Sequence, residues 1–200
     1  MTDPQNARGR RTVIALLAAT RHIIENDGMP ALTMAAVAER AGVTRRAVYL
    51  HFASRTDLVT ALYRSFAESE NLAESLQVVW DAPDAVSGLR AWAAHLVRIN
   101  LRVLAVLRAL EQAQHTDPDA AALWRITQRN WLESSRRVVE RLAREGTLAP
   151  HLTVDTATDL LWALMSLDLL DRLAHQRHWS NKRLTDQLTA TYIAAFVAPS

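Results

Sequence analysis

Residues 33–58 read TMAAVAERAGVTRRAVYLHFASRTDL, and this stretch decides the fold. Val37 and Ala41 have the four-residue spacing of one helical face, and Gly42 follows where the chain must leave the helix through a left-handed backbone conformation. Thr44 is then a suitable N-cap for a second helix. A helix, a tight corner and a short second helix together predict a helix-turn-helix.

The second helix of this motif has an apolar side and a polar side. Val48 and Phe52 lie one turn apart and continue the buried stripe. Guanidinium, phenol and imidazole groups on the other side suit a surface of phosphate oxygens and base edges. The outward residues are Arg45, Arg46, Tyr49 and His51.

The charge of the chain is unevenly distributed. The formal net charge of the 200 residues is only +2. Residues 1–55 contain eight arginines and four acidic residues, a net charge of +4, so residues 56–200 carry −2. This asymmetry would steer the N-terminal part toward a polyanion.

Composition excludes several classes of protein. Half of the residues are apolar, enough for a sizeable core, and the absence of cysteine excludes disulfides and thiolate metal sites. No apolar run is long enough to span a bilayer, and the basic N-terminus does not lead into a signal sequence. We expect a cytoplasmic protein that neither spans a membrane nor carries a cofactor.

Helical spacing dominates the chain, and no window alternates as a strand does, so the sequence predicts an all-α protein. We expect two domains: residues 1–55 form an N-terminal arm and a three-helix, helix-turn-helix DNA-binding domain, and 56–200 form a helical ligand-binding and dimerisation domain. A helix at 56–80 is expected to connect them. The other helices are expected at about 11–27, after Thr33, after Thr44, after Asp84, at 119–145, at 157–173 and after Ser180.

Several of these helices have predicted apolar faces. In the helix at 11–27 the inward residues are expected to be Ile14, Leu17, Ala18 and Ile24. In the helix at 119–145 they are expected to be Leu123, Ile126, Asn130, Ser134, Val138 and Leu142.

The chain resembles the TetR family of bacterial transcription regulators over residues 11–62. The resemblance is carried by AERAGVT at 38–44, VYLHF at 48–52, and a basic residue followed by an acid in SRTDL. It implies an N-terminal three-helix domain that reads DNA. It also implies a larger helical domain that binds a small effector and dimerises through its last two long helices.

The resemblance assigns roles to residues of the motif. Arg45, Arg46 and Ala47 would face base edges, and Arg55 would replace the family's usual lysine at the start of the next helix. Many members have a small residue where Arg46 stands and a polar or basic one where Ala35 or Ala36 stands, so the operator cannot be inherited from relatives. The residues expected to hold phosphates or the DNA backbone are Thr33, Thr44, Tyr49, His51 and Arg55.

The expected effector site lies in the C-terminal part. Polar residues on apolar helix faces, such as Asn100, would need partners if buried and could orient a largely apolar ligand. Backbone groups or water could satisfy them equally, and tryptophans at helical spacing are more often plain core. The predicted effector residues are Trp92, Leu96, Asn100, Asn130, Ser134, Trp162 and Met165. The predicted dimerisation residues are Leu160, Leu164, Leu167, Leu184, Leu188, Tyr192 and Phe196.

A metal site and an active site are the remaining alternatives. Asp171, His175 and His178 have the spacing of a metal site, but such residues near a helix end more often complement the helix dipole, so we expect no metal. No nucleophile elbow, phosphate loop or HExxH signature is present, so we do not expect an enzyme.

The sequence therefore predicts a homodimeric repressor that binds double-stranded DNA. Two copies related by a twofold axis would place their recognition helices about 34–36 Å apart and require a palindromic operator. A small, largely apolar effector would release it. The alternative is a DNA-binding regulator whose C-terminal domain responds to a protein partner, which a solid core without a cavity would favour.

Overall fold

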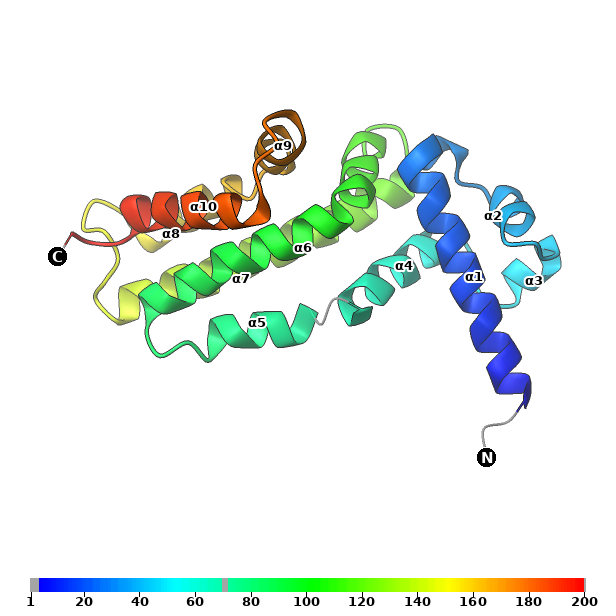
Figure 1. Ribbon diagram of the computed structural model, residues 1–200, viewed down its shortest axis with the longest axis horizontal. Helices are drawn as coiled ribbons and strands as arrows, with labels where there is room; N and C mark the ends of the chain where they lie inside the picture. The colour runs from blue at the N-terminus through cyan, green and yellow to red at the C-terminus, as the bar shows by residue number, and fades with distance from the viewer. Residues whose placement is uncertain (1–3, 70–71, 200) are drawn as a thin grey trace. The chain divides into compact units, whose positions relative to one another are not determined.

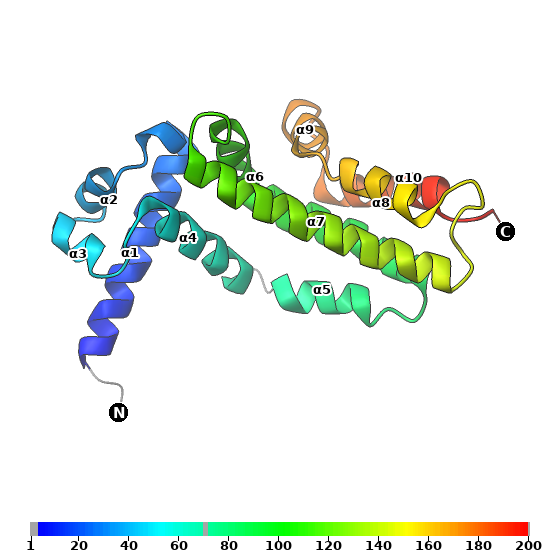
Figure 2. The same ribbon diagram turned by 180° about the vertical axis from the view of Figure 1, so that it is seen from behind.

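A computed structural model describes residues 4–69 and 72–199 of the chain, with side chains for 9–66 and 72–199 (Figures 1 and 2). Regular structure in this part is helical, and its only β-type pairing is an isolated bridge between Leu148 and Val197. The predicted all-α class is thus confirmed. Contacts divide the chain into two compact units, Met1–Ser69 with Ala105–Trp124 and Glu70–Leu104 with Arg125–Ser200.

The first unit begins with α1, Pro4–Asp27, which starts earlier than the predicted residue 11. Proline is favoured at the first position of a helix, because its missing N–H would have no partner there. The buried side of α1 carries Leu16 and Ile23, whereas Ile14 is 67% exposed. The predictions that Ile14 and Ala18 point inward are wrong, because both are exposed and the buried side of α1 runs through Leu16, Ala19 and Ile23 instead.

Two short helices follow α1 and the 3₁₀ turn η1, Met29–Ala31. These are α2, Met34–Arg40, and α3, Arg45–Tyr49. α2 contacts both α1 and α3, and α4, Arg55–Ser69, closes the unit against α1. Helical residues continue in α5, Leu72–Trp80, and the junction at 70–71 within the predicted helix 56–80 lies outside the described residues.

The second unit is organised around α6, Ala85–Ala113, and α7, Pro118–Arg144, each of which also contributes residues to the first unit. Within the second unit the end of α7 meets the start of α6, so the two helices are antiparallel. Glu145 accepts a hydrogen bond from the Ala85 N–H at 2.6 Å. Its carboxylate thus lies at the positive end of α6, and hydrogen bonds from Ala85 and Arg141 lower the pKa of Glu145.

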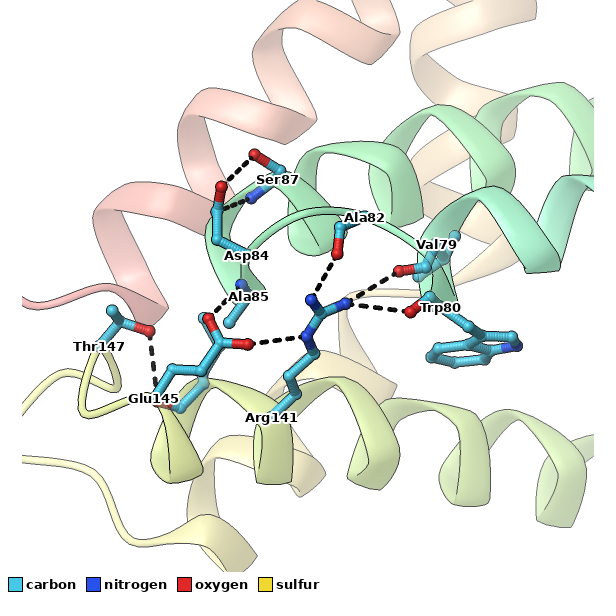
Figure 3. Close-up of polar contacts among 10 residues, drawn as sticks. Val79, Trp80, Ala82, Asp84, Ala85, Ser87, Arg141, Glu145 and Thr147 are labelled. Carbon is cyan, nitrogen blue, oxygen red and sulfur yellow. Dashed lines mark hydrogen bonds and ion pairs between the residues drawn. The ribbon is translucent and has the colours of Figure 1, made fainter.

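Arg141 of α7 binds the C-terminal end of α5 (Figure 3). Its guanidinium donates to the carbonyl oxygens of Val79, Trp80 and Ala82 at 3.5, 3.2 and 2.5 Å. It also pairs with Glu145 at 2.9 Å. The last carbonyls of a helix have no partner within the helix, so Arg141 supplies a cap for α5 from another element.

The predicted single helix at 157–173 is wrong. The structure has α8, Val154–Ala163, then α9, Leu167–Asp171, followed by a π-helical turn η2, Arg172–Gln176. Ser166 breaks the helical path with φ −54° and ψ 126°. The bend buries Met165, whose sulfur accepts a hydrogen bond from Ser135 of α7 at 3.4 Å. The bend between α8 and α9 therefore allows different sides of this apolar segment to be buried.

The chain ends in α10, Asn181–Phe196, which Ser180 caps by accepting the Arg183 N–H at 3.2 Å. Leu184 and Tyr192 of α10 are fully buried in the core of the second unit. The Phe196 carbonyl accepts the Ala149 N–H at 2.9 Å, which attaches the end of α10 to the loop after α7.

Candidate nucleic-acid interface and effector site

Threonines begin both helices of the helix-turn-helix. Thr33 Oγ1 accepts the Ala36 N–H at 3.0 Å, and Thr44 Oγ1 accepts the Ala47 N–H at 3.2 Å. Both threonines are exposed. Because a threonine hydroxyl is also a donor, each keeps an O–H that can point at a phosphate oxygen beside the positive helix end.

The corner between α2 and α3 depends on Gly42. Its φ of 66° lies in the left-handed region, and a Cβ built there would meet nothing within 4 Å. The requirement for glycine is therefore one of backbone conformation. The next N–H, from Val43, donates to the Ala38 carbonyl at 3.0 Å and ends α2.

Helix α3 buries Val48 completely and exposes its other sides. On one side the Arg45 guanidinium lies 5.7 Å from the ring centre of Tyr49 and donates to its hydroxyl at 3.5 Å. Arg46 is exposed on the next side, one turn before Leu50, which is 75% exposed. Leu50 was not among the predicted DNA-contact residues, although its four-residue separation from Arg46 is visible in the sequence.

Of the remaining predicted DNA-contact residues, Ala47 is half-buried and His51 is exposed. The His51 ring lies close to α1, because a Cβ built on Gly9 would be 4.0 Å from it. Arg55, at the start of α4, forms an ion pair with Asp117, and the two side chains are 30% and 11% exposed. This partner was not predicted, because it lies 62 residues further along the chain.

Asp117 has two roles in the first unit. Besides pairing with Arg55, its carboxylate accepts the N–H groups of Asp119 and Ala120 at 3.0 and 3.3 Å, so it caps α7. A pocket of about 260 Å³ lies beside the pair and is lined by Pro30, Arg55, Ala113, Thr116, Asp117 and Pro118.

The predicted effector residues divide into two groups. Trp92, Leu96 and Met165 belong to one hydrophobic cluster, and Asn100 lies buried two turns beyond Trp92 on α6. Asn130 is exposed and Ser134 is half-buried. They are not brought into the core as predicted, because the buried stripe of α7 is displaced by one position. Its buried polar residues are Thr127 and Ser135.

Among the buried side chains of α6, a tryptophan and an asparagine each carry a donor without a protein partner within the described part of the chain. They are Trp92 Nε1 and Asn100 Nδ2, on side chains 2% and 4% exposed. By contrast, the Trp162 indole N–H donates to Gln128 Oε1 at 3.1 Å. Buried donors without partners are costly, so this face of α6 has unused hydrogen-bonding capacity.

His95, on the same helix, is a buried titratable group that the sequence interpretation missed. It is 7% exposed, stacks on Trp92 with ring centres 5.5 Å apart, and its Nδ1 lies 2.8 Å from the Ser75 hydroxyl. Burial, with a smaller contribution from the positive charge of Arg98, lowers the pKa of His95 to about 4. The imidazole is therefore neutral at pH 7.

Most residues predicted for dimerisation lie in the interior of the second unit. Leu167, Leu184, Leu188, Tyr192 and Phe196 are at most 6% exposed, so their side chains are core contacts within one chain. This corrects their predicted place at a dimer surface: the stripe of α10 faces its own unit. Leu164 is half-buried, and Leu160 of α8 is 47% exposed.

The alternative metal residues do not assemble. His175 Nδ1 lies 2.8 Å from Asp171 Oδ1, while His178 has a left-handed backbone with φ 53°. In the described segments, no cluster of three or more histidine and acidic side chains could hold a metal ion. Within the same segments, no helix combines the length and apolarity needed to cross a membrane.

In the described residues, α3 is the second helix of a helix-turn-helix and exposes two arginines beside the capped starts of α2 and α3. These features define the class of helix-turn-helix proteins. Residues 16–62 match the model of the bacterial regulatory proteins of the tetR family. The N-terminal helix-turn-helix of this chain is therefore a TetR-family domain. A search of curated proteins found no match.

Several solved structures share the fold. NalD, the secondary repressor of the MexAB-OprM multidrug efflux pump in Pseudomonas aeruginosa, aligns with a TM-score of 0.71 at 22% identity, covering 94% of this chain and 98% of NalD. A bacterial regulatory protein in the tetR family from Rhodococcus RHA1 aligns with 0.71 at 15% identity, covering 94% and 98%. SmeT in complex with triclosan aligns with 0.70 at 19% identity, covering 94% and 93%.

Proposed function

We propose that the chain is a homodimeric transcriptional repressor that binds a palindromic operator and is released by a small, largely apolar effector. The observation that carries this proposal is the outer surface of the helix-turn-helix, in which Arg46 and the Arg45–Tyr49 pair lie exposed beyond the Thr44 cap. Arginine side chains, a phenol and a helix start are the groups that bind phosphates and guanine edges in the major groove.

The DNA-binding part is tested by selecting duplexes from a random-sequence library with the full chain. We expect the selected duplexes to contain an inverted repeat whose half-sites lie about one helical turn, 10–10.5 base pairs, apart. Affinity should fall steeply as salt is raised, because bound arginines release counterions from the phosphates. Equal affinity for selected duplex, random duplex and heparin would contradict the proposal.

The effector part is supported by the core around α6. Trp92, Leu96 and Met165 supply an apolar environment, and Trp92 Nε1 and Asn100 Nδ2 are buried donors. A mainly apolar molecule with a carbonyl, ether or phenolate oxygen would satisfy such donors. Triclosan, found with the structurally similar SmeT, has this chemistry and is a suitable first probe.

The effector is tested by adding triclosan and other apolar compounds with one oxygen acceptor to the complex with selected DNA. We expect at least one compound to raise the melting temperature of the protein and to release the DNA. Asn100→Leu should weaken the stabilisation and the release of DNA by the compound. It should keep the affinity for the operator, because Asn100 lies outside the helix-turn-helix. If no compound in a broad apolar set does either, the effector part of the proposal fails.

A further inference from the structure

Leu50 is an apolar side chain in a cationic surface. Its exposure of 75% exceeds that of every other large apolar residue whose side chain the structure describes. It follows directly on α3, and its N–H donates to the Arg46 carbonyl at 3.1 Å. Leu50 therefore contributes little to the core of the first unit, where Val48 is fully buried.

The outer part of α3 has two distinct sides. Residues four apart lie on the same side of a helix. Arg45 and Tyr49 form one such pair, joined by the contact between guanidinium and phenol ring. Arg46 and Leu50 form the other pair, one charged and one apolar.

The second pair has the chemistry of base recognition. Arg46 can donate two hydrogen bonds to guanine, and in the major groove the thymine C5-methyl is the apolar group that base edges present. Leu50 lies about 6 Å further along the helix than Arg46, which corresponds to roughly one to two base pairs at 3.4 Å each. The two residues can thus contact neighbouring bases of one half-site.

We propose that Leu50 is a specificity-determining residue that packs on a thymine methyl one or two base pairs from the base contacted by Arg46. This inference rests on the proposed DNA-binding function. It assigns to the end of the recognition helix a preference for thymine that is independent of hydrogen bonding.

The test uses the duplex selected from random DNA by the full chain. Each thymine of both half-sites is replaced in turn by deoxyuridine, which removes only the methyl group. At one thymine near the Arg46 base, we expect wild-type affinity to fall about fourfold per half-site, the effect of one buried methyl-sized group. Leu50→Ala should bind the thymine and deoxyuridine duplexes equally well.

The matched control is Leu132→Ala, the same change at an exposed leucine of α7. It should keep the wild-type sensitivity to deoxyuridine, and all variants should retain the helical circular dichroism of the wild type. If Leu50→Ala keeps the full methyl sensitivity, or if no thymine is sensitive in the wild type, the inference is wrong. Failure to select any duplex would instead remove the proposed function, and the inference with it.

Discussion

Arg45 and Arg46 are neighbours in the chain but differ in their surroundings. Arg45 is engaged with the ring and hydroxyl of Tyr49, whereas Arg46 is exposed on the side of Leu50. The engaged arginine has less freedom to reorient toward a base. Arg46 is therefore the better candidate for base readout.

Arg46→Ala is expected to weaken binding to the selected operator by about 1–3 kcal/mol and to relax the preference at one base pair, because a bidentate contact to guanine is lost. Competition binding with single-base variants of the operator measures both effects. Arg129→Ala, at an exposed arginine of α7, is the control and should change neither. Equal weakening of operator and random DNA by Arg46→Ala would assign Arg46 to the phosphates.

The resemblance to the TetR family assigns Arg55 to a DNA phosphate, and in the structure Arg55 pairs with Asp117. Asp117 would therefore compete with the phosphate for Arg55. Asp117→Asn should keep the cap of α7, because asparagine caps helices as well as aspartate does, but remove the ion pair. We expect tighter binding to every sequence and a salt dependence steeper by roughly one released counterion. Titrations at several salt concentrations measure the slope.

The comparison variant for Asp117 is Asp119→Asn, two residues further along the same helix start. It removes the same charge without touching the Arg55 pair. If both variants raise the affinity equally, the effect is one of net charge, and competition for Arg55 is excluded.

His95 should make the stability of the protein depend on pH. Its pKa is lowered to about 4 in the folded chain, while an unfolded histidine titrates near 6.5. Below pH 6.5 the unfolded state binds more protons than the folded state, so stability falls as the pH falls toward 4. Between pH 7 and pH 5 we expect a loss of roughly 2 kcal/mol from this group.

Urea unfolding of the wild type and of His95→Gln at pH 7 and pH 5 measures this contribution. Glutamine keeps a polar group near Ser75 but does not titrate, so the variant should lose about 2 kcal/mol less than the wild type over this interval. An identical loss in both proteins would show that other groups cause the acid sensitivity.

At the scale of elements, the starts of several helices were predicted correctly, whereas the buried faces of α1 and α7 were not. The helix starts at Thr33, Thr44 and Ser180 could be predicted, because a cap depends on residues within one turn. The faces of α1 and α7 could not, because their apolar residues fit more than one stripe and the packing partner decides between them. The break between α8 and α9 has neither glycine nor proline to signal it.

The corner of α5, α6 and α7 leads to a prediction about an element. Arg141→Met keeps a long, unbranched side chain but removes the guanidinium that caps α5 and pairs with Glu145. We expect a loss of about 1–3 kcal/mol in the free energy of unfolding, since part-buried carbonyls lose their donor. Denaturant unfolding monitors the change.

The matched control for the α5 cap is Arg144→Met, at an exposed position about one helical turn further along α7. It should stay within about 0.5 kcal/mol of the wild type, as surface changes usually do. Equal effects of the two substitutions would mean that Arg141 acts only through the general charge of α7.

At the scale of the whole molecule, the fold class was predictable from the sequence and the chemistry of the core around α6 was not. Helical periodicity and the helix-turn-helix motif sufficed for the all-α fold, which solved regulators share at 15–22% identity. The buried residues around α6 come from segments far apart in the chain. Their combined chemistry therefore depends on tertiary packing, which periodicity does not specify.

A dimer would have to use the residues that the second unit leaves exposed, and Leu160 of α8 is the predicted dimerisation residue that meets this condition best. Leu160→Asp should convert the dimer into a monomer, because an unpaired carboxylate would be desolvated at the interface. Sedimentation measures the mass. Leu132→Asp is the matched control, and a Leu160→Asp protein that sediments as the wild type does would exclude α8 from the interface.

The first compact unit takes residues 105–124 from the middle of the chain. No single cut can therefore excise this unit intact, and a fragment that stops at 69 would leave Asp117 behind. A chimaera that exchanges the first unit with that of another protein of this fold would need to transplant two separate segments, residues 1–69 and residues 105–124, the second of which carries Asp117. Recombination at a single crossover between residues 69 and 105 would likewise separate Arg55 from Asp117.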